Sequence, residues 1–199
     1  MWPNRRIGDM TALTWLGVPG DERAWTALGF TVDDREIQIG RVCCALTDER
    51  CWGFDETHGD AAILGIPTTV RPALAGAVHP CGVTHVDHVV YTVPDLDTGT
   101  TALTATLGTP PRRRFHPRGP DGPEMAFYRV GEAFIEVVAS GAEPALIGLA
   151  LRSPDLDATV SAIRAAGGPI SDPKPAVQGG RIATVWHGHL DWGLAIMGP

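Results

Sequence analysis

Two ionisable residues stand within apolar stretches of this chain. His88 begins the mostly apolar run 88–93, and Glu136 interrupts the apolar run 133–138. A carboxylate in such a run is costly to bury unless it is paired or bound to a metal ion. We therefore predict that His88 and Glu136 face each other or a cavity, either as a general acid–base pair or as two ligands of a divalent ion. The structural alternative is a pair that only hydrogen-bonds inside the fold.

The elements that must position this pair belong to an internal repeat. The segment Pro94–Asp97 returns as Pro154–Asp157, 60 positions later. The same offset relates further small residues, namely Ala102 to Ala162, Ala105 to Ala165 and Gly108 to Gly168. Self-similarity at a fixed offset indicates a duplicated supersecondary unit, and it outweighs the propensity of any single segment.

Each copy is predicted to contain a strand, a helix and further strands, which makes it a βαβββ-like module. The first copy has predicted strands at 88–93, 124–130 and 133–140, with a helix that Asp95 or Asp97 caps and Gly108 ends. The second copy has predicted strands at 147–153, 182–186 and 193–197, with a helix at 156–166. One such module cannot cover its own sheet, so two must pair to bury a core.

The N-terminal part is predicted to be a shorter, degenerate version of the same order. A strand at 11–18 precedes a short helix capped by Asp21, and strand-like pieces follow at 30–32, 36–39, 41–46 and 51–54. Residues 56–84 are rich in Gly, Pro and Thr, which is typical of a connector. We predict a degenerate module plus linker at 1–80 and a two-module domain at 81–199, with modules at 84–141 and 145–199.

Charge and cysteine usage argue against several classes of partner. The formal net charge of −7 argues against a nucleic-acid surface, which would show a basic face. No run reaches the ~18 apolar residues of a membrane span, and no apolar run of signal-peptide length follows the N-terminus. Three of the four cysteines crowd into 43–51 without a C-x-x-C pair. We therefore expect reduced thiols in a cytoplasmic protein rather than a zinc site or a disulfide framework.

Three segments carry a resemblance to a known superfamily: 87–97, 127–138 and 148–157. The repeated pattern resembles the vicinal oxygen chelate superfamily, which contains the glyoxalase, bleomycin-resistance and extradiol-dioxygenase proteins, and it is most similar to a glyoxalase-like subgroup without an assigned activity. The resemblance implies an α+β fold in which paired βαβββ modules form a curled mixed sheet around metal and substrate. The N-terminal segment would then be an extra, degenerate module.

The resemblance also implies where a metal would bind. The superfamily uses one position on the first strand and one on the last strand of each module, which here correspond to His88 and Glu136 in the first module and to Gly148 and Ala195 in the second. The implied metal site therefore keeps only half of its ligands. His187 or His189 is the possible third ligand. The cofactor is left unknown, with a divalent metal as one possibility.

The same curled sheet implies ligand-binding residues. Arg152 lies four positions after Gly148, so strand alternation puts both on the face of the implied cavity. A guanidinium there would bind a carboxylate or phosphate with two hydrogen bonds, and the alternative is an ion pair with Glu136 or a side chain extended to the strand end. The aromatic residues expected to line the same space are Phe127, Tyr128 and Trp186.

The leading functional hypothesis is a protein that binds a small organic molecule in a concave pocket, with possible acid–base chemistry by His88 and Glu136. One alternative is a divalent-metal-dependent lyase, isomerase or dioxygenase. Another is a non-catalytic, sequestering protein like the bleomycin-binding members, so catalysis itself is left open. Leu13 stands where His88 does in the later repeat, so the N-terminal module offers no ligand. We expect that module to pack on the two-module body or to pair with its copy in a homodimer.

Overall fold

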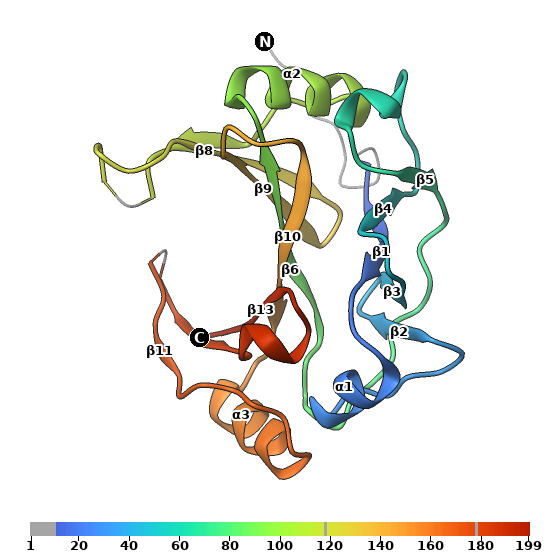
Figure 1. The fold of residues 1–199 in the computed structure, drawn as a ribbon, viewed down its shortest axis with the longest axis vertical. Helices are drawn as coiled ribbons and strands as arrows, with labels where there is room; N and C mark the ends of the chain where they lie inside the picture. Colours follow the sequence, from blue (N-terminus) through green and yellow to red (C-terminus); the bar gives the residue numbers. More distant parts are fainter. Residues whose placement is uncertain (1–10, 118, 178) are drawn as a thin grey trace.

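Two β-sheets form the protein. The computed structural model describes residues 11–117, 119–177 and 179–199, and the first ten residues of the predicted N-terminal module lie outside this part. The strand orders are β2-β3-β1-β4-β5 in the smaller sheet and β11-β12-β13-β10-β6-β9-β8-β7 in the larger one. Figure 1 shows the larger sheet curling so that β8 and β11 project to the same side, while the smaller sheet stands on the opposite side.

The larger sheet consists of two modules with the same topology. The first contains β6 (His85–Val93), α2 (Leu96–Leu107), β7 (Arg113–Phe115), β8 (Met125–Val130) and β9 (Ala133–Ala139). The second contains β10 (Ala145–Arg152), α3 (Leu156–Ala165), β11 (Lys174–Pro175), β12 (Arg181–Thr184) and β13 (Gly193–Gly198). In each module the first strand runs parallel to the last, and antiparallel pairing of β6 with β10 joins the modules. The predicted α+β fold of paired βαβββ modules is confirmed.

The repeated sequence motif performs the same two tasks in both modules. The side chain of Asp95 accepts a hydrogen bond from the backbone N–H of Thr98 at the start of α2, and Asp155 caps α3 in the same way. The second aspartate of each motif binds an arginine on a strand of its own module: Asp97 contacts Arg114 of β7 at 2.7 Å, and Asp157 contacts Arg181 of β12 at 2.7 Å. The same four-residue motif therefore fixes the start of the helix in each of the two modules.

The smaller sheet departs from this topology. It contains β1 (Leu13–Val18), α1 (Glu22–Ala27), β2 (Glu36–Ile39), β3 (Val42–Leu46), β4 (Cys51–Phe54), the 3₁₀ turn η2 (Ala61–Leu64) and β5 (Thr68–Val70). β1 runs parallel to β3, so β3 takes the place that the fourth strand has in the later modules. β4 pairs antiparallel with the other edge of β1, as β10 does with β6. The degenerate module thus has one strand fewer than the later modules, and the last of its five predicted strands, 51–54, forms β4 on the other edge of β1.

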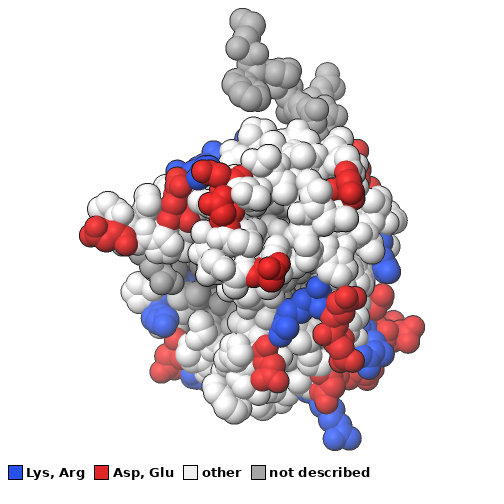
Figure 2. Space-filling model, turned by 45° about the horizontal axis from the view of Figure 1, so that its top comes forward, with Lys and Arg blue, Asp and Glu red and all other residues white. Residues whose placement is uncertain are grey.

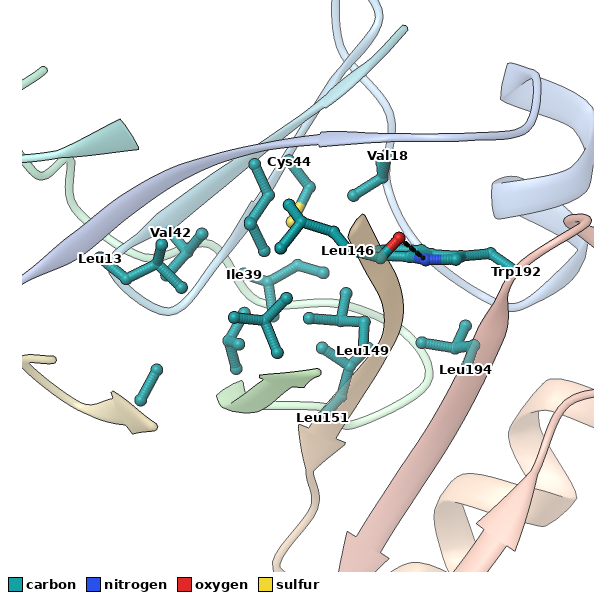
Figure 3. Close-up of a cluster of buried hydrophobic side chains, with 14 of the residues drawn as sticks. Leu13, Val18, Ile39, Val42, Cys44, Leu146, Leu149, Leu151, Trp192 and Leu194 are labelled. Carbon is teal, nitrogen blue, oxygen red and sulfur yellow. Dashed lines mark hydrogen bonds between the residues drawn. The ribbon is translucent and has the colours of Figure 1, made fainter. Parts of the chain in front are cut away.

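The two sheets share one hydrophobic core. Figure 3 shows side chains of the smaller sheet (Leu13, Val18, Ile39, Val42 and Cys44) meeting side chains of the larger one (Leu146, Leu149, Leu151, Trp192 and Leu194). The indole N–H of Trp192 donates to the carbonyl of Leu146 at 3.2 Å, so this buried polar group is satisfied. Of the two expected arrangements, the N-terminal unit packs on the body of its own chain. The possible homodimer stays a prediction.

A glycine turn makes a polar contact between the two sheets. Gly40 has a φ of +59° between β2 and β3, a conformation that favours glycine. A Cβ atom there would also collide with the side chains of Glu132 and His85. The Glu132 carboxylate accepts a hydrogen bond from the backbone N–H of Arg41. Close approach of the two sheets at this point therefore depends on the missing side chain.

Other features of the described chain bear on the expected partners. The four cysteines are buried free thiols. None of the described helices is long and apolar enough to cross a membrane. On the face shown in Figure 2, acidic and basic side chains are interspersed, and no continuous basic area covers that face.

We expect truncation of the shared core to destabilise both sheets together. Leu149→Ala removes a side chain that is 2% exposed, and a loss of about 2–5 kcal/mol in the free energy of unfolding is typical of such a cavity. Urea unfolding followed by tryptophan fluorescence should show one shifted transition. Val78→Ala is the control, because this side chain is 94% exposed and its loss should change stability by less than about 0.5 kcal/mol. Separate transitions for the two sheets would contradict a shared core.

Candidate functional site

A cavity of about 510 Å³ lies on the concave side of the larger sheet and draws side chains from both modules. Its polar lining consists of Asp87, His88, Glu136, Arg113, Arg152, Lys174 and Thr184. Its apolar lining includes Met125, Phe127, Phe134, Ile182 and Met197. The two candidate residues His88 and Glu136 therefore face the same space, from the adjacent strands β6 and β9.

An irregularity in β6 brings a further residue, Asp87, into the cavity lining, although the regular alternation of side chains along a strand would place it on the opposite face. His88 pairs with Ala150 and Val86 pairs with Leu151, so Asp87 is an extra residue between two ladder positions, a β-bulge. Consecutive side chains of a regular strand point to opposite faces. The bulge breaks this rule, and both Asp87 and His88 line the cavity.

The imidazole of His88 lies between two carboxylates. Its Nδ1 is 2.7 Å from Oδ1 of Asp87, and its Nε2 is 4.0 Å from Oε2 of Glu136. The contact between His88 and Asp87 is a strong hydrogen bond, whereas the distance between His88 and Glu136 is too long for a hydrogen bond. With a proton on Nδ1 directed at Asp87, the lone pair of Nε2 points toward Glu136 and the cavity. The arrangement can accept a proton from a molecule bound between them, or return one to it.

Asp87 is held in its ionised form by its neighbours. Burial alone would raise the pKa of this carboxyl, but the hydrogen bond from His88 and the positive charges of His88, Arg152 and His85 outweigh it and leave the pKa below its ordinary value. An ionised Asp87 fixes the ring orientation and the tautomer of His88. Asp87 is thus a candidate site residue that was not predicted from the sequence.

Arg152 forms an ion pair with Asp87 and not with Glu136, the partner considered in the sequence analysis. Its Nη1 lies 3.7 Å from Oδ2 of Asp87, not against Glu136. The side chain lines the cavity as predicted and is 39% exposed. One carboxylate, Asp87, therefore contacts both His88 and Arg152 with its two oxygens.

The strand register gives the second module small residues where a metal would need ligands. Glu136 on β9 pairs with Val90 on β6. At the corresponding place in the second module, Ala195 on β13 pairs with Ala150 on β10. Within the described ranges, no group of three or more His, Cys, Asp or Glu side chains could hold a metal ion. Asp87 cannot complete such a group, because it contacts the Nδ1 edge of the imidazole and Glu136 faces the Nε2 edge. The donor set does not fit the divalent ion that the superfamily implies.

The two histidines considered as a third metal ligand lie elsewhere. His187 and His189 belong to the 3₁₀ turn η3 (His187–His189), and neither lines the cavity that contains His88. His187 lines a second hollow, of about 440 Å³, beside Asp191. Nε2 of His189 is 2.9 Å from the carbonyl oxygen of Ala24 in the smaller sheet's unit. The contact of His189 with Ala24 joins the two units.

The three predicted aromatic residues lie in different places, and of the three Phe127 alone lines the cavity. Phe127 lines the cavity opposite Glu136 on the neighbouring strand. Tyr128 is fully buried on the other face of β8, where its hydroxyl donates to the carbonyl of Thr100 at 2.8 Å under α2. Adjacent residues of a regular strand cannot both face one cavity, which is why Tyr128 is excluded. Trp186 is 68% exposed and lies outside the cavity lining.

Lys174, Arg113 and Met197 also line the cavity and were not predicted as site residues. Lys174 and Arg113 belong to short strands at the two edges of the sheet, and the sequence around them carries no periodic signal. A signal did exist for Asp87. Val86 and Val89 are both buried although they are three positions apart, and this spacing marks a bulge in the alternation.

Comparisons place this geometry among known folds. No protein-family model matches the sequence, and no curated protein matches it. Among solved structures, methylmalonyl-CoA epimerase from Mycobacterium tuberculosis is similar, with a TM-score of 0.50, 23% identity, and coverage of 59% of this chain and 89% of that chain. A Streptomyces coelicolor methylmalonyl-CoA epimerase variant in complex with 2-nitronate-propionyl-CoA has a TM-score of 0.49 and 17% identity, and covers 58% of this chain and 94% of that chain.

The chain has the vicinal oxygen chelate fold. Within this fold, the matched share corresponds in size to the two-module sheet, so the smaller sheet is additional to it. At such identity the likeness concerns the backbone arrangement. The chemistry of the cavity in this protein has to be judged from its own side chains.

The Asp87 contacts predict a specific pH dependence of stability. Because the pKa of Asp87 is lower in the folded than in the unfolded protein, its contribution is fully present above the ordinary value of 3.8 and is lost as the pH falls through the folded-state value. We expect Asp87→Asn to lower the free energy of unfolding near pH 6, and to flatten its fall between about pH 5 and pH 2. Urea unfolding across this range measures the effect.

The control for this measurement is Asp48→Asn, since Asp48 is exposed and lies outside the cavity. This variant should keep the pH profile of the wild type. An unchanged profile for Asp87→Asn would show that the contacts with His88 and Arg152 do not stabilise the folded protein.

Proposed function

We propose that this protein binds a small organic molecule in the cavity of the larger sheet and that His88 and Glu136 move protons on it. The observation that carries the proposal is the placement of Nε2 of His88 4.0 Å from Oε2 of Glu136 in that cavity. The gap is too wide for a direct hydrogen bond and leaves room for a reacting hydrogen between the two groups.

His88 would act as the first proton acceptor. Asp87 accepts from Nδ1, so in the neutral imidazole the lone pair lies on Nε2, which is directed at the cavity. The pairing of a carboxylate with the far nitrogen also stabilises the imidazolium that forms when the proton arrives. His88 is partly buried, with 22% of its side chain exposed, so the ligand can reach it while most bulk water is kept away.

Glu136 would act beside His88, on an atom next to the one that His88 deprotonates. Its side chain is 17% exposed and sits between Phe127 on β8 and Val90 on β6. A second acid–base group at this distance from Nε2 can return the proton at a neighbouring atom of the ligand. Isomerisation and elimination reactions can use such a two-group proton transfer.

A metal-dependent lyase, isomerase or dioxygenase is the alternative that the donor set disfavours. Gly148 and Ala195 bring no ligand atoms from the second module, and two protein ligands are fewer than divalent ions normally take. A sequestering protein remains the rival without chemistry, because the apolar cavity wall could retain a ligand by itself. The free, buried thiols support a place in the cytoplasm, where thiols remain reduced.

Proton transfer can be tested before the substrate is known. We expect the protein, with a chelator present, to accelerate exchange of C–H protons for deuterium in at least one member of a panel of small ketones and 2-oxo acids, measured by NMR in D₂O. His88→Ala and Glu136→Gln should each slow this exchange by about 10²–10⁴-fold, the usual contribution of a general acid or base.

Asp172→Asn provides the control, because Asp172 pairs with Arg164 on the surface, away from the cavity. It should leave the exchange rate unchanged. Ligand binding without any exchange would favour the sequestering protein over an enzyme.

Metal content gives an independent test. We expect purified protein to carry well under one divalent ion per chain, and to show no saturable uptake when Mn²⁺, Fe²⁺, Ni²⁺ or Zn²⁺ is added, because the cavity lacks a third converging ligand. Elemental analysis and calorimetric titration measure this. Stoichiometric binding that His88→Ala abolishes would establish the metal-dependent alternative instead.

A further inference from the structure

We propose that Arg152 forms an anion subsite in this cavity and that the ligand is a small monocarboxylate with an apolar body. The inference rests on the proposed function in that it needs the cavity to bind a ligand, but it does not need that ligand to react. It concerns which chemical group of the ligand the second module recognises.

Among the described residues, the guanidinium of Arg152 has no hydrogen-bond acceptor. Its contact with a described residue is the ion pair with Asp87, where the N–O distance of 3.7 Å is too long for a hydrogen bond. An arginine carries five N–H donors in a planar fork, which matches the two oxygens of a carboxylate. The side chain lines the cavity and is little more than one-third exposed, so a carboxylate entering the cavity would supply acceptors that are otherwise missing.

The sheet register leaves room for that carboxylate next to the proton-transfer groups. The row of residues across the sheet from His88 continues with Ala150 on β10, Ala195 on β13 and Thr184 on β12. These side chains are small, so they leave space in the cavity beside the imidazole. Arg152 follows Ala150 by two positions, roughly 7 Å along the strand. A ligand could contact Arg152 with its carboxylate and reach His88 with a neighbouring carbon.

The charges around the cavity favour a single negative charge over two. The cationic side chains are Arg113, Arg152 and Lys174, and the carboxylates are Asp87 and Glu136. The cations attract an anion, whereas a dianionic phosphate near Arg152 would lie close to Asp87 and be repelled. The planar, singly charged carboxylate fits both conditions.

The remaining wall determines the rest of the ligand. It is formed by Met125, Phe127, Phe134, Ile182 and Met197. Aromatic and sulfur-containing side chains of this kind pack against aliphatic or aromatic groups. The inferred ligand is therefore amphipathic, with one charged end.

Benzoate and its neutral isostere benzamide test the inference directly. Kd values are measured by NMR titration of the full-length protein in the presence of a chelator. Benzoate should bind the wild type at least about tenfold more tightly than benzamide does, since a hydrogen-bonded charge pair contributes a factor of this size. Inorganic phosphate should bind more weakly than benzoate. Equal affinities for benzoate and benzamide, or tighter binding of phosphate, would overturn the proposal.

Variants locate the subsite. Arg152→Gln should weaken benzoate binding about tenfold or more and leave benzamide binding unchanged, and Arg152→Lys should restore part of the loss. Arg181→Gln is the matched control, because Arg181 pairs with exposed Asp157 and does not line the cavity. It should bind benzoate as the wild type does. Unchanged benzoate affinity in Arg152→Gln would overturn the proposal.

A second measurement avoids dependence on folding of the variants. In the wild type, benzoate should shift the Nε–Hε resonance of the Arg152 guanidinium, and benzamide should not; absence of a benzoate-specific shift would overturn the subsite. The two proposals fail separately. Carboxylate-selective binding without any hydrogen exchange would remove the chemistry and keep the subsite, whereas exchange on neutral ketones without carboxylate selectivity would do the opposite.

Discussion

The antiparallel ladder between β6 and β10 joins the two modules, and each of its faces has a separate task. On one face Val89, Leu149 and Leu151 are buried in the core that the larger sheet shares with the N-terminal sheet. On the other face the ladder places His88 and Arg152 at the floor of the cavity. A slip of one residue would move each side chain to the opposite face. The burial of the leucines therefore fixes the register on which the site depends.

The near-symmetry of the modules makes their chemical asymmetry easy to see. His88 and Glu136 occupy positions whose counterparts in the second module are Gly148 and Ala195. Two further ionisable groups there would need a metal or additional partners, because unpaired charges are costly to bury. Small residues avoid that cost and leave space. The charged groups that the second module does supply to the cavity, Arg152 and Lys174, are cationic and cannot act as metal ligands.

The β-bulge at Asp87 shows how a local irregularity can organise a site. It turns two consecutive side chains to one face, so a single strand supplies both the imidazole and the carboxylate that orients it. The second module has a register shift at the corresponding place, where Ile147 stands in place of Asp87. The backbone device is thus shared by both modules, and only its first copy carries a polar side chain.

The sequence alone determined the repeat, the two βαβββ modules and the candidates His88 and Glu136, and it narrowed the cap of the first module's helix to Asp95 or Asp97. Local periodicity and capping are encoded by residues close together in the chain. It did not reveal Asp87, and it grouped Tyr128 with Phe127 although a regular strand sends them to opposite faces. Only the tertiary structure decided that Arg152 contacts Asp87, that His189 contacts Ala24 and that the N-terminal sheet covers its own chain. Each of these depends on packing between segments far apart in sequence.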